Sequence, residues 1–435
     1  MFPLHLKRKR FEFAVTGQGV REMIGQMAIT QTVSQTVSQT ERTVSKPGRV
    51  LSVDVLRGIT IALMILVNDP GDWDHIFGQL DHAAWNGWTL TDMVFPAFLF
   101  LMGASIIFSL QARIARGNCK GTLAGHIFAR AGKILALYWV LAFFPRMHWT
   151  IRWFGVLPRI ALCYLLASLV LLATRRVRVL IAIVAFLLVG YWVLLRWVPV
   201  PGLGTPMRDI PFMDQNANLA SWIDRGVSSW SLRWLHTGTL YRKTRDPEGL
   251  LSTLPAVATT LLGALAGMWM INGQRVVNGM RRMRIGLAAM GVAGVAAGVL
   301  WSRWFPINKN LWTSSFVLLM AGWTALALAG CSWLIDDRPQ PWPRWLRISS
   351  WPWLVFGSNA IAAFTVSVIL VKVLLFFKIA DSDGDKNNLW GVIYESVFAR
   401  NGSTNWTSLA FAVSFVVICF LPNWWLWRKK IFLKL

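Results

Sequence analysis

From residue 51 to residue 427 the chain alternates between long apolar stretches and shorter polar ones. A helix that crosses a bilayer needs about 20 mostly apolar residues, because the hydrocarbon core is about 30 Å thick and an α-helix rises about 1.5 Å per residue. The pattern predicts spans at 51–68, 90–110, 131–145, 157–174, 179–197, 251–272, 285–302, 312–334, 353–377 and 406–427. Span 131–145 is short, and Pro158 and Arg159 interrupt span 157–174. We therefore predict an all-α, polytopic integral membrane protein with about ten transmembrane helices.

The distribution of charge predicts how these spans are oriented. The formal net charge is +24, and the lysines and arginines gather in alternate loops between the spans. The basic loops contain Arg113, Arg116, Lys120, Arg130, Arg175, Arg176, Arg178, Arg275, Arg281, Arg282, Arg284, Arg338, Arg344 and Arg347, whereas loop 69–88 has no lysine or arginine. Cytoplasmic loops carry the excess of Lys and Arg, so we expect both termini in the cytoplasm, which requires an even number of spans. Charges placed between apolar spans indicate a lipid bilayer as the partner and exclude a nucleic-acid-binding surface.

Residues 1–48 differ from the rest of the chain. They are polar, they include the run TVSQTVSQTERTVS, and they lack the apolar core of a signal peptide, which predicts a disordered cytoplasmic tail. Residues 49–435 then form one transmembrane domain. The four cysteines are scattered and make no CxxC motif, so we interpret them as packing residues and predict no metal site.

Several polar residues stand where a spanning helix is expected to be apolar. Asp54 and Arg57 are three residues apart in the first span, so they share a helix face and can pair. Ionisable groups inside a membrane are candidates for function, although a structural ion pair is an equally good interpretation here. Asn68 ends the same span.

A second polar group precedes the next span, in the segment DHAAWNGWTLTDMVFPAFLFLMGAS. His82 lies there close to the predicted outer surface, and Asp92 follows it ten residues later. A lone histidine is often only a packed or solvated residue, so spacing by itself leaves His82 as a candidate. The long outer loop at about 198–250 is a further candidate, because connections of this length are usually functional.

At these residues the sequence resembles the heparan-α-glucosaminide N-acetyltransferase family, which includes a lysosomal enzyme and bacterial relatives. The resemblance rests on SVDVLRG, on the helix end at Asn68 and on DHAAWNGWTLTDMVFPAFLFLMG. Further matching blocks follow in order: GVLPRIALCY, DPEGLLSTLPAVATTLLGALAG, INKNLWTSSFVLL and FGSNAIAAF. Together they cover nearly the whole chain from about residue 50 to residue 427.

The resemblance implies a transmembrane acyltransferase domain at 49–435 in a bacterial inner membrane. It implies transfer of an acetyl group from cytoplasmic acetyl-CoA to the amine of a glucosamine-type sugar on the periplasmic side, by an enzyme that forms a homodimer. His82 matches the active-site histidine of the family, and Asn68 matches a nearby polar residue of the site.

These implied roles lead to a mechanistic hypothesis. The acceptor amine must lose a proton to attack a thioester, and an imidazole, which ordinarily titrates near pH 6.5, suits that task. His82 acts either as this general base, which we favour because it requires fewer steps, or as an acceptor of the acetyl group itself. Asn68 could donate a hydrogen bond to the developing oxyanion. Asp92 either orients the imidazole or caps the helix that begins in TLTD.

The remaining candidates concern binding. Coenzyme A carries phosphates, which arginine binds well, so we assign Arg57, its neighbour Asp54, and Arg159 to the cofactor. Asn359 is a candidate donor in the path of the cofactor, and an interhelical hydrogen bond is the alternative. The candidates for holding the sugar are Lys309, Asn308, Asp246 and Glu248. A structural role is an open alternative for each of these residues.

Two other functions stay open. An amino-sugar permease without acyl transfer would also place polar residues inside the membrane. A membrane acyltransferase that acts on a cell-wall glycan would share the chemistry but not the acceptor. Transfer of label from acetyl-CoA to a sugar separates the enzyme from the permease, and a panel of acceptors separates the two enzymes.

Overall fold

The computed structural model describes residues 50–145, 151–274, 276, 279–338, 342–380 and 386–433, so the predicted tail at 1–48 lies outside the described residues. The long helices are α2 (Leu51–Asn68), α3 (Leu90–Ile114), α4 (Lys120–Phe143), α5 (Val156–Ala173), α6 (Val177–Trp197), α8 (Thr253–Gln274), α9 (Gly279–Trp301), α10 (Ser314–Ile335), α11 (Arg344–Ser358), α12 (Ala360–Phe376) and α14 (Asn405–Arg428). In this described part, nine helices are long and apolar enough to cross a membrane, and the number is ten if the bent pair α11 and α12 forms one span. The predicted polytopic helical fold is confirmed.

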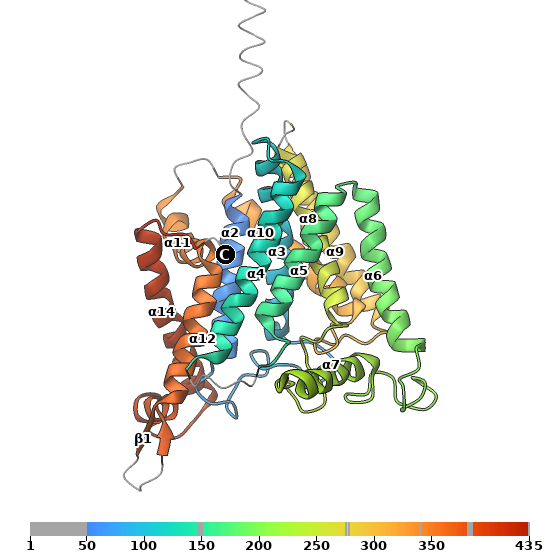
Figure 1. The fold of residues 1–435 in the computed structure, drawn as a ribbon. Helices are drawn as coiled ribbons and strands as arrows, with labels where there is room; N and C mark the ends of the chain where they lie inside the picture. The colour runs from blue at the N-terminus through green and yellow to red at the C-terminus, as the bar shows by residue number, and fades with distance from the viewer. Residues whose placement is uncertain are drawn as a thin grey trace, which may run out of the picture. The chain divides into compact units, whose positions relative to one another are not determined.

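The predicted outer loops contain structure of their own. Helix α7 (Leu219–Leu235) lies within the long loop, and strands β1 (Lys378–Ala380) and β2 (Lys386–Asn388) form a small antiparallel pair. Two short helical segments follow, α13 (Leu389–Ile393) and η1 (Tyr394–Phe398). Figure 1 shows α7 lying across the end of the helix bundle at which the loop between α2 and α3 also lies. We call this the outer end, and the end at which α2 begins the inner end.

Three of the predicted spans differ from the helices that the structure shows. Helix α4 begins at Lys120 and is longer than predicted; its Arg130 guanidinium lies 4.7 Å from the ring centre of Tyr164, which gives that charge a partner. Helix α5 is not interrupted, because Pro158 falls in its first turn, where a missing N–H breaks no helical hydrogen bond. The span predicted at 353–377 is instead broken between α11 and α12 by a bend of 78°.

Close helix crossings are made possible by glycines. A Cβ atom on Gly103 of α3 would lie 1.9 Å from the backbone oxygen of Thr260 on α8, and one on Gly263 of α8 would lie 1.8 Å from the oxygen of Phe100. A similar crossing joins α2 to α11 at Gly58 and Gly357. Small residues let helix backbones approach each other in a membrane. These crossings hold the helices that flank the outer loops at fixed positions.

The cysteines are only partly as predicted. Cys163 and Cys419 are buried packing residues and Cys331 is partly buried, whereas Cys119 is exposed just before α4. Its thiol lies 3.1 Å from the hydroxyl of Thr122 in the first turn of that helix. The interpretation of Cys119 as a packing residue is therefore wrong.

Candidate active site

Two loops at the outer end form the framework of the site. One joins α2 to α3 and contains His82, and the other joins α9 to α10 and contains Lys309. The backbone N–H of Gly87 donates to the carbonyl of Ile307 at 2.8 Å, and the side-chain amide of Asn308 donates to Asn86 at 3.2 Å. These hydrogen bonds bring together two segments that are far apart in the sequence; Asn86 and Asn308 are separated by 222 residues.

His82 and Asp92 are in direct contact. Nδ1 of the imidazole lies 2.9 Å from Oδ1 of Asp92, whose side chain is 1% exposed, whereas the His82 side chain is 40% exposed. The second carboxylate oxygen of Asp92 accepts hydrogen bonds from the backbone N–H groups of Thr89 and Ala83, each at 3.1 Å. Asp92 therefore makes both contacts considered for it, one with the imidazole and one with the start of α3.

Lys309 completes this group from the opposite loop. Its Nζ lies 2.9 Å from Nδ1 and 3.3 Å from Nε2 of His82, and 3.3 Å from Oδ1 of Asp92. Burial lowers the pKa of Lys309, and the charges of Asp92 and Glu248 oppose this shift only in part. A base, a carboxylate and an amine thus meet at one point near the outer surface. We call His82, Asp92 and Lys309 the outer triad.

The acidic residues assigned to the sugar lie in the loop before α8. Asp246 receives two hydrogen bonds from Arg152, from Nε at 2.6 Å and from Nη2 at 2.5 Å, and Glu248 pairs with the same guanidinium. Burial lowers the pKa of Arg152, but the two carboxylates outweigh this effect and hold that pKa above its ordinary value. Asp224 of α7 accepts from the backbone N–H of Leu250 at 2.9 Å, and burial raises the pKa of Asp224 to about 7. Asp246 thus holds its own loop in place, and sequence reasoning missed its partner Arg152, which no recognisable motif marks.

Arg159 of α5 contacts this loop and is 1% exposed. Its Nη2 donates to the carbonyl of Gly249 at 3.1 Å and to the hydroxyl of Ser252, and the guanidinium lies 5.0 Å from the ring centre of Trp312. Among the described residues, its Nε and Nη1 have no hydrogen-bond partner. Arg159 therefore does not extend to an aqueous interface, and it lies near the outer end of α5.

The other cofactor candidates gather toward the inner end. Arg57 donates to Asp54 at 2.5 Å, to the carbonyl of Gly357 at 2.8 Å and to the hydroxyl of Ser105 at 3.2 Å. Two residues after Gly357, Asn359 stands at the break between α11 and α12, where its amide group bonds to the backbone of Ile431 and Leu433, each at 3.0 Å. Asp54, Arg57 and Asn359 thus belong to one region around the contact of α2 with α11, whereas Arg159 lies at the other end of the bundle.

The two remaining candidates have different positions. Asn308 is fully buried and Asn68 is exposed at the end of α2, and no hydrogen bond joins Asn68 to His82 in the described part of the chain. The role of Asn68 therefore stays a prediction. Asn308 receives the backbone N–H of Leu311 at 2.9 Å, so it shapes the loop that presents Lys309.

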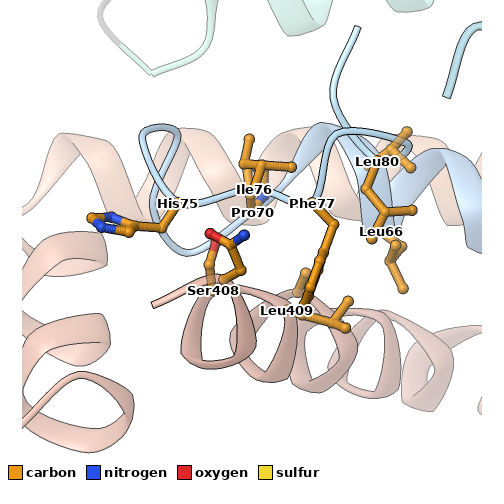
Figure 2. Close-up of a pocket in the computed structure, with 11 residues that line it drawn as sticks. Leu66, Pro70, His75, Ile76, Phe77, Leu80, Ser408 and Leu409 are labelled. Atoms are coloured by element: carbon orange, nitrogen blue, oxygen red, sulfur yellow. The ribbon is translucent and has the colours of Figure 1, made fainter. Parts of the chain in front are cut away.

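An apolar pocket lies beside this region but does not contain the outer triad. It is lined by residues of α2, of the following loop and of α14, among them Leu66, Phe77 and Leu409 (Figure 2). His75 is at its edge and is paired with Asp72 at 2.7 Å, and a hydrogen bond from Ser403 lowers the pKa of Asp72. This second histidine is thus part of a network that holds the loop against the start of α14.

Comparison with known proteins gives consistent results. Residues 49–297 match the family model described as heparan-alpha-glucosaminide N-acetyltransferase, catalytic. The human heparan-alpha-glucosaminide N-acetyltransferase is 26% identical over 436 aligned residues, which cover 91% of this chain and 61% of the human protein. The mouse protein of the same name is 25% identical, with 79% of this chain and 57% of the mouse protein covered. The chain thus spans about three fifths of the length of these relatives, and His82 and Asp92 fall within the family match.

Proposed function

The chain belongs to the heparan-α-glucosaminide N-acetyltransferase catalytic family, and on this basis we propose that it is a membrane enzyme that acetylates the amine of a glucosamine-type sugar. We propose acetyl-CoA as the donor, from the cytoplasmic side of a bacterial inner membrane, and the sugar as the acceptor on the periplasmic side. We further propose a homodimer. The observation that carries the proposal is the outer triad, whose geometry suits proton transfer from an amine.

Asp92 determines which nitrogen of His82 is basic. A carboxylate only accepts hydrogen bonds, so the 2.9 Å contact favours the tautomer with the proton on Nδ1 of His82 and the lone pair on Nε2. The Nε2 lone pair can then take a proton from the acceptor amine as that amine attacks the thioester carbonyl. The imidazolium returns the proton to the departing thiolate, and the buried carboxylate of Asp92 stabilises the positive ring in between.

The donor must supply its acetyl group to the outer end, while its phosphates require cationic or N–H donors at the inner end. Of the residues predicted to bind the donor, Arg57 and Asn359 lie there and could hold its polar groups. Each nitrogen of the Arg57 guanidinium already donates within the protein, so a phosphate would have to exchange with Asp54 or Ser105. Arg159, at the outer end, is better placed for the thioester end of the donor than for its phosphates.

The test is acetylation of glucosamine by the purified protein with radiolabelled acetyl-CoA. We expect labelled N-acetylglucosamine with wild type, and a rate lower by about 10²-fold or more with His82→Ala. Because the His82 side chain is 40% exposed, the substitution leaves packing intact, and an unchanged unfolding temperature is the control. Product at the same rate from both proteins would remove His82 from the mechanism. Absence of product from folded wild type that binds acetyl-CoA would indicate another acceptor, and absence of binding would favour the permease.

A further inference from the structure

The amine of Lys309 lies next to the proposed general base. Its Nζ is 2.9 Å and 3.3 Å from the two ring nitrogens of His82. A general base has to lie within roughly 2.6–3.2 Å of the atom whose proton it removes. A primary amine of the protein itself therefore comes close to meeting the distance requirement that the proposed reaction places on the amine of a sugar.

The contact between His82 and Asp92 leaves one ring nitrogen of His82 able to accept a proton. Nδ1 of His82 cannot donate to Asp92 and accept from Lys309 at the same time, because it carries either a proton or a lone pair. With the proton held by Asp92, the lone pair that remains is on Nε2, and the amine of Lys309 lies 3.3 Å from it. An atom this close to both ring nitrogens lies over the face of the ring, so the Lys309 amine has to move into the ring plane before the Nε2 lone pair can take its proton.

The structure also keeps this amine beside His82. The side chain of Lys309 is 19% exposed, and its Nζ is anchored by Asp92 at 3.3 Å. Asn308 next to it is fully buried and the backbone carbonyl of Lys309 accepts from Trp312 at 3.0 Å. Burial lowers the pKa of Lys309, which increases the fraction of the neutral amine, the form that can attack a carbonyl. Charged groups that face the triad are Asp81 on the same loop as His82, and Glu248, which acts on Lys309.

We propose that Lys309 is an internal acceptor, which the donor thioester acetylates when no sugar occupies the site. The inference rests on the proposed function, because it uses the same donor and the same base. The neutral amine of Lys309 attacks the thioester carbonyl carbon, and a nitrogen–carbon bond forms as Nε2 of His82 takes one amine proton. The carbon–sulfur bond then breaks, and the imidazolium gives its proton to the thiolate. The products are Nε-acetyl-lysine and free coenzyme A.

This reaction has consequences that distinguish it from random acetylation. The acetylated side chain carries no charge and can no longer pair with Asp92. Each chain therefore accepts one acetyl group at Lys309, and the modification then ends. A bound sugar must displace the Lys309 amine from His82, so acceptor and lysine compete for the same donor. Lysines that lie at the outer end but away from His82 provide the comparison, and Lys243 and Lys378 are both exposed there.

The experiment incubates the purified full chain with acetyl-CoA in the absence of sugar and follows acetylation of each lysine by peptide mass spectrometry. We expect Lys309 to approach one acetyl group per chain while Lys243 and Lys378 stay at background. Adding glucosamine should reduce acetylation of Lys309 as its concentration rises. His82→Ala should lower the rate at Lys309 by about 10²-fold or more. Lys309→Arg keeps the positive charge and should remove the label from this peptide alone.

The outcomes separate this inference from the proposed function. Wild-type protein that acetylates glucosamine but leaves Lys309 unmodified would overturn the inference and leave the function standing. Equal acetylation of Lys309 in wild type and His82→Ala, or of Lys309 and Lys243, would also overturn it, because the modification would then not depend on the site. A folded protein that acetylates neither sugar nor lysine would overturn both proposals.

Discussion

The carboxylate of Asp92 contacts His82 and Lys309 through one oxygen and the start of α3 through the other. Thr89 and Asp92 form a capping box, in which each side chain is bonded to the backbone of the other residue. The orientation of the imidazole and the first turn of α3 are therefore fixed by the same side chain. A change at this position affects both unless the second oxygen is retained.

Asp92→Asn removes the negative charge but keeps an oxygen that can accept from Thr89 and Ala83. We expect acetyl transfer to glucosamine to fall by about 10²-fold or more, because the imidazolium loses its counter-charge and the tautomer of His82 is no longer set. The unfolding temperature should change little. Both are measured on purified protein, as a turnover rate and as a thermal unfolding curve.

The matched control is Thr89→Ala, which weakens the cap and leaves the charge of Asp92 in place. Loss of an N-cap side chain costs about 1 kcal/mol, so this variant should be less stable but should keep most of its activity. If Asp92→Asn were as active as wild type, Asp92 would be only a capping residue.

At the scale of elements, the site depends on helices that cross at fixed points. Asp92 is on α3, and the loop with Glu248 leads directly into α8. These two helices are in contact through Gly103 and Gly263. A Cβ atom added to Gly103 would lie 1.9 Å from the backbone of α8, and one added to Gly263 would lie 1.8 Å from the backbone of α3. Backbone cannot give way as a flexible side chain can, so the whole helix would have to shift.

We therefore expect Gly103→Ala to destabilise the protein by about 1–3 kcal/mol, the usual cost of overpacking, and to lower activity because α3 carries Asp92. The apparent unfolding temperature in detergent measures the first effect and glucosamine acetylation the second. Gly132→Ala on α4 is the control, since a Cβ there meets nothing within 4 Å. Alanine is the better helix former, so this variant should be as stable as wild type or more stable. Similar unfolding temperatures for the two variants would contradict the importance of the crossing.

At the scale of the molecule, the polar residues form groups at opposite ends of the bundle. Asp54 is in the first turn of α2 and the loop with His82 begins after its last residue, so roughly 20 Å of helix separates them at about 1.5 Å per residue. A donor that binds near Arg57 has to present its acetyl group over this distance. The side from which the donor enters therefore depends on which end of the bundle faces the cytoplasm.

The exposed Cys119 offers a direct test of this orientation. It lies between α3 and α4, on the side predicted to be cytoplasmic, and a hydrogen bond with Thr122 lowers its pKa and so favours the reactive thiolate. We expect a membrane-impermeant maleimide to label Cys119 in inside-out membrane vesicles and not in right-side-out ones. A Lys243→Cys substitution in the outer loops should show the opposite behaviour. Labelling of both positions from the same side would contradict the predicted topology.

The features of this protein that follow from local composition can be predicted from its amino-acid sequence. Each span is recognisable because about 20 apolar residues in succession can satisfy their backbone only as a helix inside a bilayer. The alternation of basic loops is also visible in the sequence. So is the pairing of Asp54 with Arg57, because the two residues are neighbours on one helix face. His82 and Asp92 were candidates for the same reason, since only ten residues separate them.

Contacts between segments that are distant in the sequence become known only from the folded chain. Lys309 is 227 residues from His82, and nothing in the local pattern indicates that its amine meets the imidazole. The partners of Arg159 and Asp246, the break at Asn359 and the buried position of Asn308 are likewise results of packing. Such contacts depend on how whole helices cross, which is set by glycines and loops far from the residues concerned, and therefore the residues alone do not reveal them.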